Sequence, residues 1–144
     1  MNIASLLASK GPRVITLSSE HTIRQALALL TTHNIGALVV VDAAETPVGI
    51  LSERDIVRAL ARDEGIFDQP AGNIMTRDVI LGVPQDDLVA VSHTMTERRI
   101  RHLPVMDAGR LVGIVSIGDV VKAQRDQYQG ELDTLQLQVL KSPA

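Results

Sequence analysis

The chain of 144 residues combines 45% hydrophobic with 22% charged residues, a composition typical of a globular protein built around one core. A net charge of −3, one Phe, one Tyr and no Trp argue against nucleic-acid binding, because they supply neither a basic surface nor aromatic platforms for bases. The lack of cysteine excludes disulfides, thiolate catalysis and cysteine zinc sites, and agrees with a reducing compartment. We expect a cytoplasmic protein.

Signals for membrane insertion or catalysis are also missing from the sequence. No stretch approaches the roughly 20 apolar residues of a membrane span, and residues 1–7 lack signal-peptide character. The four histidines have no metal-ligand spacing, and neither a phosphate-binding P-loop nor a nucleophile elbow occurs. The sequence therefore predicts no membrane contact, no metal site and no enzyme activity.

The hydrophobic pattern predicts strand, helix, strand, turn, strand and helix in the first half of the chain. The expected elements are a short helix over 2–9, a strand over 13–17, a helix from Ile23, strands over 37–41 and 48–51, and a helix after Ser52. Ser18 or Ser19 is expected to cap the second of these helices. Gly65, Pro70 and Gly72 mark a linker to the second half.

The same order of elements returns in the second half. The expected elements are a strand at Val79-Ile80, a helix after Pro84, strands over 103–106 and 111–115, and a helix from Ile117. This last helix continues over 120–140, where Tyr128, Leu132, Leu135 and Val139 form an apolar stripe. Packing on its own domain and contact with a second copy both explain that stripe.

Each half contains a strand that ends in a Ser-x-x-Asp step into a helix, 64 residues apart. The two copies are Val48-Gly49-Ile50-Leu51-Ser52-Glu53-Arg54-Asp55 and Val112-Gly113-Ile114-Val115-Ser116-Ile117-Gly118-Asp119. An internal repeat of this length indicates two copies of one supersecondary unit. Since units of about 60 residues are marginal alone, we expect them to fold as a single body.

With these motifs the sequence resembles a stand-alone CBS-domain pair, also called a Bateman module. The segments that carry the resemblance, besides the two repeated strands, are Ile35–Asp42, Ile74–Thr76 and Arg101–Asp107. The resemblance implies an α/β fold of two βαββα-type repeats with pseudo-twofold symmetry. We place repeat 1 at 7–66, repeat 2 at 72–126 and a C-terminal helical extension at 127–144.

The resemblance also implies adenine-nucleotide sites between the repeats and pairing of modules into a homodimer. We call each Ser-x-x-Asp step a corner: Ser52–Asp55 is the first corner and Ser116–Asp119 the second. At each corner the helix N-terminus favours an anion, and the Asp carboxylate suits the two hydroxyls of a ribose. We therefore expect Asp55 and Asp119 to hold ribose, and Ser52 and Ser116 to hold ribose or phosphate. The same Ser-x-x-Asp spacing is also a helix capping box that needs no ligand.

The two corners differ in their neighbouring cations. Arg54 precedes Asp55 and is expected to bind a phosphate, whereas Gly118 precedes Asp119, so only the first corner brings its own cation. The second half has Arg98, Arg99, Arg101 and His102 before its central strand. These basic residues form either a solvated helix end or, through Arg101 or His102, a phosphate contact.

By resemblance, the base pockets are lined by residues near the strands of both halves, namely Thr16, Ala37, Leu38, Val79, His102 and Pro104. The sequence thus predicts a regulatory sensor that binds AMP, ADP or ATP and acts through cleft or dimer geometry on an unidentified protein partner. Binding of NAD or S-adenosylmethionine is an alternative ligand assignment. A structural interaction module without ligand is the other alternative.

Overall fold

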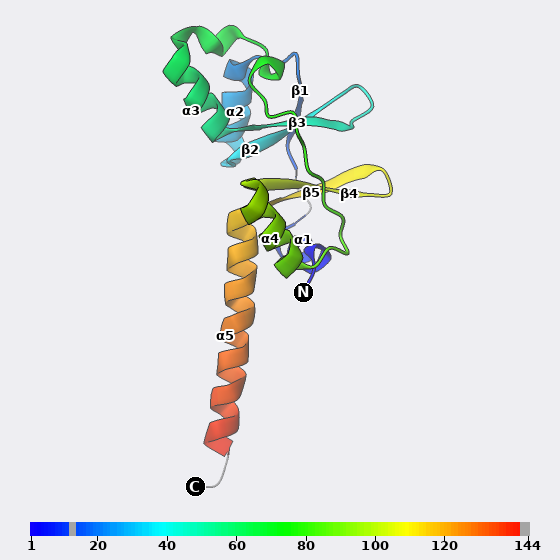
Figure 1. Ribbon diagram of the computed structural model, residues 1–144, viewed down its shortest axis with the longest axis vertical. Helices are drawn as coiled ribbons and strands as arrows, with labels where there is room; N and C mark the ends of the chain where they lie inside the picture. Colours follow the sequence, from blue (N-terminus) through cyan, green and yellow to red (C-terminus); the bar gives the residue numbers. More distant parts are fainter. Residues whose placement is uncertain (12–13, 142–144) are drawn as a thin grey trace.

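The computed structural model describes the backbone of residues 1–11 and 14–141, and side chains as far as residue 133. The first half contains α1 (Ile3–Lys10), β1 (Thr16–Ser18), α2 (Ile23–His33), β2 (Ala37–Val41), β3 (Pro47–Ser52) and α3 (Glu53–Arg62). The 3₁₀ helices η1 (Glu64–Asp68) and η2 (Ala71–Asn73) follow, and the second half continues with α4 (Leu88–Arg98), β4 (His102–Asp107), β5 (Arg110–Ser116) and α5 (Ile117–Lys141). Figure 1 shows the two halves as stacked layers with α5 leading away from them.

The sheet of the first half has one strand more than that of the second. In the first, β1 pairs parallel to β2 and β2 pairs antiparallel to β3. In the second, β4 and β5 pair antiparallel. The segment that precedes α4, residues 77–87, which we call the connector, pairs with β4 at a single parallel bridge between Gly82 and Val105. The strand expected at Val79-Ile80 is therefore wrong.

Proline explains the missing strand. In the first half the Val39 N–H donates to the carbonyl of Ile15 at 3.2 Å and holds β1 on β2. Sixty-five residues later, the place of Val39 is taken by Pro104, which has no N–H to donate. The backbone at Ile80 consequently makes no sheet hydrogen bond to Pro104, so this part of the connector is not held in the sheet.

The cap of α2 also differs from the expectation. Thr22 and Gln25 form a reciprocal capping box, in which the Thr22 hydroxyl accepts from the Gln25 N–H at 3.1 Å and the Gln25 side chain accepts from the Thr22 N–H at 2.9 Å. Ser18 lies upstream, where its hydroxyl accepts from the N–H of Glu20. Thr22 replaces the serines because the chain needs the intervening turn before the helix begins.

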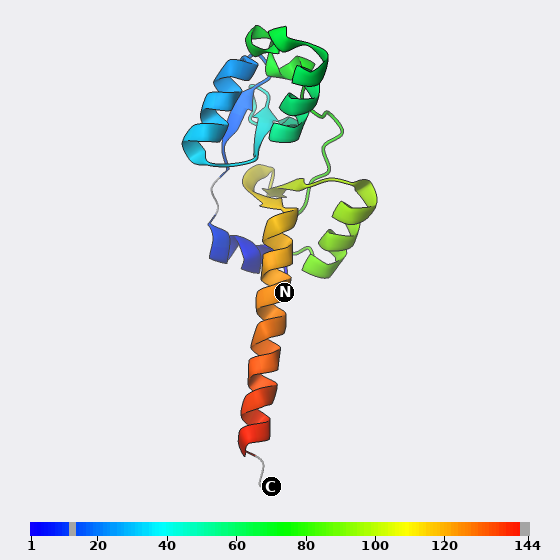
Figure 2. The same cartoon turned by 90° about the vertical axis from the view of Figure 1, so that its left-hand side faces the viewer.

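The hydrophobic core of each half includes side chains from the first segment of the other half. The helix α1 buries Ile3, Leu6 and Leu7 in the core of the second half, against Leu88, Val91, Met95, Leu103, Val105, Val115 and Val120. Leu7, where repeat 1 was expected to begin, thus packs within the second core. Ala71 and Met75, at the start of the second half, pack in the first core. Figure 2 shows α1 beside the second half, next to α5.

Matching backbone contacts hold these exchanged segments. The cap residue of α2, Thr22, bridges to Pro70, and the cap residue of α4, Asp87, bridges to Asn2. Gly49 and Gly113 allow the segments to approach closely, since a Cβ would lie 2.5 Å from the Met75 sulfur in one and 2.8 Å from a Leu7 methyl carbon in the other. The two repeats therefore resemble each other also in the way each receives a segment from the other half.

The helix α5 leaves the body of the protein and does not fold back on it (Figure 1). Its first turns are anchored by the buried Val120, but Tyr128 is 63% exposed. Tyr128 therefore does not pack on its own domain, and the side chains of Leu135 and Val139 lie outside the described residues, so both explanations of the stripe remain predictions. No helix in the described part of the chain has the length and apolar character needed to cross a membrane.

Truncation of Leu6 tests the exchange of segments. Leu6→Ala removes a 5% exposed side chain from the second core and should lower the free energy of unfolding of the chain by about 2–4 kcal/mol, since it leaves a cavity. Val57→Ala, at a 64% exposed position of α3, should change it by less than about 0.5 kcal/mol. Urea unfolding followed by circular dichroism measures both. Equal stabilities would show that α1 is not part of the core.

Candidate functional site

A cleft of about 1150 Å³ lies between the two halves. One wall is the start of α3 with Ser52, Arg54 and Asp55, and the other is the end of α4 with Arg99 and Arg101. Apolar side chains from both halves and the connector complete the lining: Ile50, Val57, Val79, Ile80, Met95, Ile100 and Ile117. The cleft thus combines hydroxyl, carboxylate, guanidinium and apolar surfaces.

The first corner is preorganised by the capping box of α3. The Ser52 hydroxyl accepts from the Asp55 N–H at 3.2 Å, while Asp55 Oδ2 accepts from the Ser52 N–H and hydroxyl, both at 3.0 Å. Asp55 Oδ1 accepts from the Thr76 hydroxyl at 3.2 Å. The carboxylate is therefore fixed in direction, and among the described residues its partner from outside the helix start, Thr76, is neutral. These contacts are those of a helix cap, and they need no ligand.

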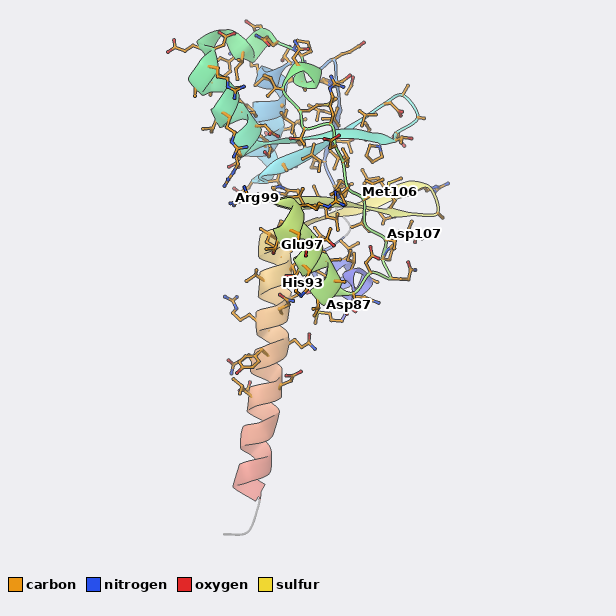
Figure 3. All side chains as sticks on the ribbon, in the orientation of Figure 1. Asp87, His93, Glu97, Arg99, Met106 and Asp107 are labelled. Carbon is orange, nitrogen blue, oxygen red and sulfur yellow. The ribbon has the colours of Figure 1, made fainter. Side chains whose placement is uncertain are left out.

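The basic wall comes from the turn that ends α4. Arg99 adopts a left-handed conformation with φ of 54°, where its counterpart 65 residues earlier is Asn34 with φ of 51°. Asparagine tolerates this conformation better than arginine does, so the arginine is retained at a local cost of order 1 kcal/mol. Figure 3 shows Arg99 at the end of α4 nearest the first half, with Asp87 at the opposite end.

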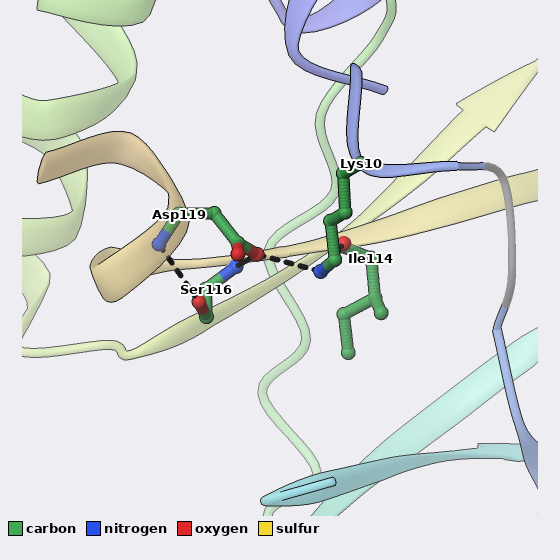
Figure 4. A network of polar contacts seen from close by, with 4 residues as sticks. All are labelled: Lys10, Ile114, Ser116 and Asp119. Carbon is green, nitrogen blue, oxygen red and sulfur yellow. Dashed lines mark hydrogen bonds and ion pairs between the residues drawn. The ribbon is translucent and has the colours of Figure 1, made fainter. Parts of the chain in front are cut away.

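The second corner holds a cation that sequence patterns did not indicate. Ser116 and Asp119 repeat the capping contacts, at 2.9 Å and 3.0 Å. Lys10 Nζ, from the end of α1, donates to Asp119 Oδ2 at 2.5 Å and to the Ile114 carbonyl at 2.7 Å (Figure 4). The contrast between Arg54 and Gly118 in the two motifs stands, but Lys10, 109 positions away in the sequence, places a cation at the second corner as well.

Burial and hydrogen bonding act in opposite directions on Asp119. Burial alone would raise the pKa of this carboxyl, but the hydrogen bond from the Lys10 side chain and those from Ser116 outweigh it and hold the pKa below its ordinary value. The side chains of Lys10 and Asp119 are 32% and 27% exposed. The pair is thus ionised and partly shielded from solvent.

His102 lies between the two corners. Burial lowers the pKa of its imidazole below 6.5, and the charges of Lys10 and Arg101 lower it further, whereas those of Asp119 and Asp55 oppose the shift. Its register partner on β5 is Ser116. The imidazole is therefore neutral at pH 7 and presents one donor and one acceptor nitrogen.

The structure brings together half of the expected site residues. Those that line the cleft are Ser52, Arg54, Asp55, Val79, Arg101 and His102. The others lie elsewhere: Ser116 and Asp119 at the second corner, Thr16 in β1, Ala37 and Leu38 in β2, and Pro104 in β4. Leu38 is fully buried in the first core. Sequence reasoning missed Thr76 and Lys10, and it did not assign a contact to Arg58 or Arg99.

The chain matches the family model described as CBS domain twice, over residues 9–62 and 71–126. The chain belongs to the CBS-domain family. Among its relatives, the mitochondrial CBS domain-containing protein CBSX3 of Arabidopsis thaliana is 34% identical over 92% of this chain and 69% of its own length. The CBS-domain protein ATU1752 of Agrobacterium tumefaciens shares the fold with a TM-score of 0.82 and 39% identity, over 86% of this chain and 99% of its own.

Two solved CBS structures contain adenosine-type ligands. PAE2072 of Pyrobaculum aerophilum was solved with AMP and is 32% identical, with a TM-score of 0.74 over 83% of this chain and 89% of its own. The CBS pair of MJ0100 was solved with methylthioadenosine and S-adenosylmethionine and is 30% identical, with a TM-score of 0.79 over 88% of this chain and 98% of its own. Adenosine ligands thus bind CBS pairs of closely similar fold.

The neutral His102 predicts a pH dependence of stability. The unfolded chain takes up a proton at this side chain near pH 6.5, while the folded chain takes it up only at lower pH. The unfolded state therefore binds more protons in that interval, and stability should fall as the pH decreases below about 6.5. Melting temperatures between pH 8 and 5 measure the effect, which His102→Gln should reduce. His93→Gln, on the exposed face of α4, should leave it unchanged, and an identical profile in His102→Gln contradicts the assignment.

Proposed function

We propose that this protein is a regulatory sensor that binds an adenine nucleotide, of the AMP, ADP or ATP type, in the cleft between its repeats. The observation that carries the proposal is the position of the Ser52–Asp55 corner opposite Arg99 and Arg101 across an apolar-lined cleft. A ribose, a phosphate and a base require these three kinds of surface at once. The AMP complex of PAE2072 supports the ligand class.

Each part of the nucleotide has a partner in the cleft under this proposal. The oriented Asp55 carboxylate accepts the ribose hydroxyls, which replace the hydroxyl of Thr76. Arg54, Arg99 and Arg101 supply guanidinium groups to phosphate, and Arg58 also lines the cleft. The base lies against apolar side chains at Val79 and Ile80, where the main chain is outside the sheet ladder.

Binding in this cleft can act as a signal because its two walls belong to different repeats. A ligand held by the start of α3 and the end of α4 favours one relative position of the repeats over others. The change in population is limited by the difference in affinity between those positions. In this proposal, the protein acts in the cytoplasm and passes the signal to a second copy of itself or to another protein.

Two other functions give distinct outcomes. S-adenosylmethionine or NAD is an alternative ligand, supported by the S-adenosylmethionine complex of MJ0100, although the sulfonium cation is poorly matched to a cleft with four arginines. A ligand-free interaction module is supported by the capping boxes and the projecting α5. Turnover of AMP or ATP by the protein would instead indicate an enzyme.

Asp55→Asn tests the ribose contact. At 100 times its Kd, AMP should raise the Tm of the wild-type protein by about 5 °C or more, since ligand bound to the native state stabilises it. Asp55→Asn should lose most of that shift because the amide accepts with only one oxygen. Asp107→Asn, at the end of β4, is the matched control and should retain it. The absence of any shift with AMP, ADP, ATP, NAD or S-adenosylmethionine would leave the interaction module as the better explanation.

Arg101→Ala tests the phosphate contact separately. Loss of a charge-assisted hydrogen bond should weaken AMP binding by about 10–100-fold while leaving the affinity for adenosine within about twofold. Isothermal titration calorimetry with both ligands measures the ratio. Arg110→Ala, at the start of β5 and outside the cleft, controls for removal of a guanidinium. Parallel losses for AMP and adenosine would show that Arg101 acts on the fold and not on the phosphate.

A further inference from the structure

We propose that Lys10 closes the second corner to a ribose, so that one nucleotide binds per chain, at the first corner. This inference rests on the proposed function and adds to it the residue that decides which of two repeated corners is used. The Lys10 ammonium lies on the Asp119 carboxylate at 2.5 Å and on the Ile114 carbonyl at 2.7 Å (Figure 4). It thereby engages Asp119 Oδ2, one of the two carboxylate oxygens that would accept from the two hydroxyls of a ribose.

The two corners are engaged at corresponding places by different chemical groups. In the first half, the backbone of Thr76 exchanges two hydrogen bonds with Ile50, at 2.8 and 2.9 Å, and its hydroxyl donates to Asp55. In the second half, the Lys10 side chain takes both positions, on the carbonyl of Ile114 and on Asp119. A neutral hydroxyl therefore meets one carboxylate and an ammonium meets the other.

This difference determines what a ribose must displace. At Asp55 a ribose hydroxyl replaces a threonine hydroxyl, an exchange of like for like. At Asp119 it must displace an ammonium and leave that charge half-buried without its partner, which is much costlier than loss of a neutral hydrogen bond. The lining of the cleft is consistent with this difference, because it includes Ser52 and Asp55 but not Ser116 or Asp119.

The ammonium is held in place by the fold and not only by its charge. Lys10 is the last residue of α1, whose buried Ile3, Leu6 and Leu7 fix the helix in the second core. The Gly11 N–H donates to the Leu7 carbonyl at 2.7 Å and ends the helix directly after the lysine. Because the helix is already ordered, the ion pair forms with little further loss of backbone entropy.

Calorimetric stoichiometry with AMP tests the inference on the full-length chain. The wild type should bind one AMP, Asp55→Asn should lose it and Asp119→Asn should keep it. Lys10→Met, which keeps the length of the side chain without its charge, should bind two, and the double variant Lys10→Met/Asp119→Asn should return to one. Two control variants should each bind one AMP. Lys10→Arg keeps a cation at position 10, and Lys122→Met removes a cation from α5.

Each other outcome has a defined meaning. One AMP in both the wild type and a Lys10→Met protein that unfolds cooperatively in urea overturns the inference and leaves the proposed function intact. Two AMP in the wild type with loss of one in Lys10→Met also overturns it, since Lys10 would then be a ligand contact. If Lys10→Met does not fold, Lys10→Gln provides the same comparison. No AMP binding by any variant contradicts the proposed function, and the inference with it.

Discussion

The exchange of segments between the two repeats is the constraint on which the rest of the structure depends. A sheet of three strands and one of two are too small to form separate stable domains. The helix α1 closes the core of the second repeat, and the residues around Ala71 and Met75 close that of the first. Each core thus includes chain from outside its own repeat, which links the folding of both. The exchange also brings Lys10 to one corner and Thr76 to the other.

Duplication gives the protein two similar corners, and a few substitutions make them different. Pro104 in place of Val39 removes a ladder hydrogen bond and releases the connector at Ile80 to line the cleft. Arg99 in place of Asn34 adds a guanidinium at a conformation that costs free energy. Pro104 deprives the second half of one strand, but the remaining elements keep their order. The fold therefore tolerates specialisation of its sites because the differences are confined to edges and turns of the sheets.

The parts of this structure that depend on local sequence could be predicted, and those that depend on distant contacts could not. The repeated strands and the capping contacts of Ser52 and Ser116 follow from periodicity and spacing within a few residues. The missing strand at Val79-Ile80 was also predictable, because Pro104 signals a lost donor. The contact of Lys10 with Asp119 has no local signal, since it depends on α1 packing in the far repeat.

His102 gives the two corners a physical connection. Its imidazole is influenced by Lys10 and Asp119 on one side and by Asp55 on the other, and it lines the cleft. A phosphate bound near Arg101 would add negative charge beside a group that the cations now keep neutral, and so would raise its proton affinity. Asp119 also lies in the first turn of α5, which leaves the body of the protein. Under the proposed function, a phosphate in the cleft would therefore change the charge near Asp119 and the start of the projecting helix.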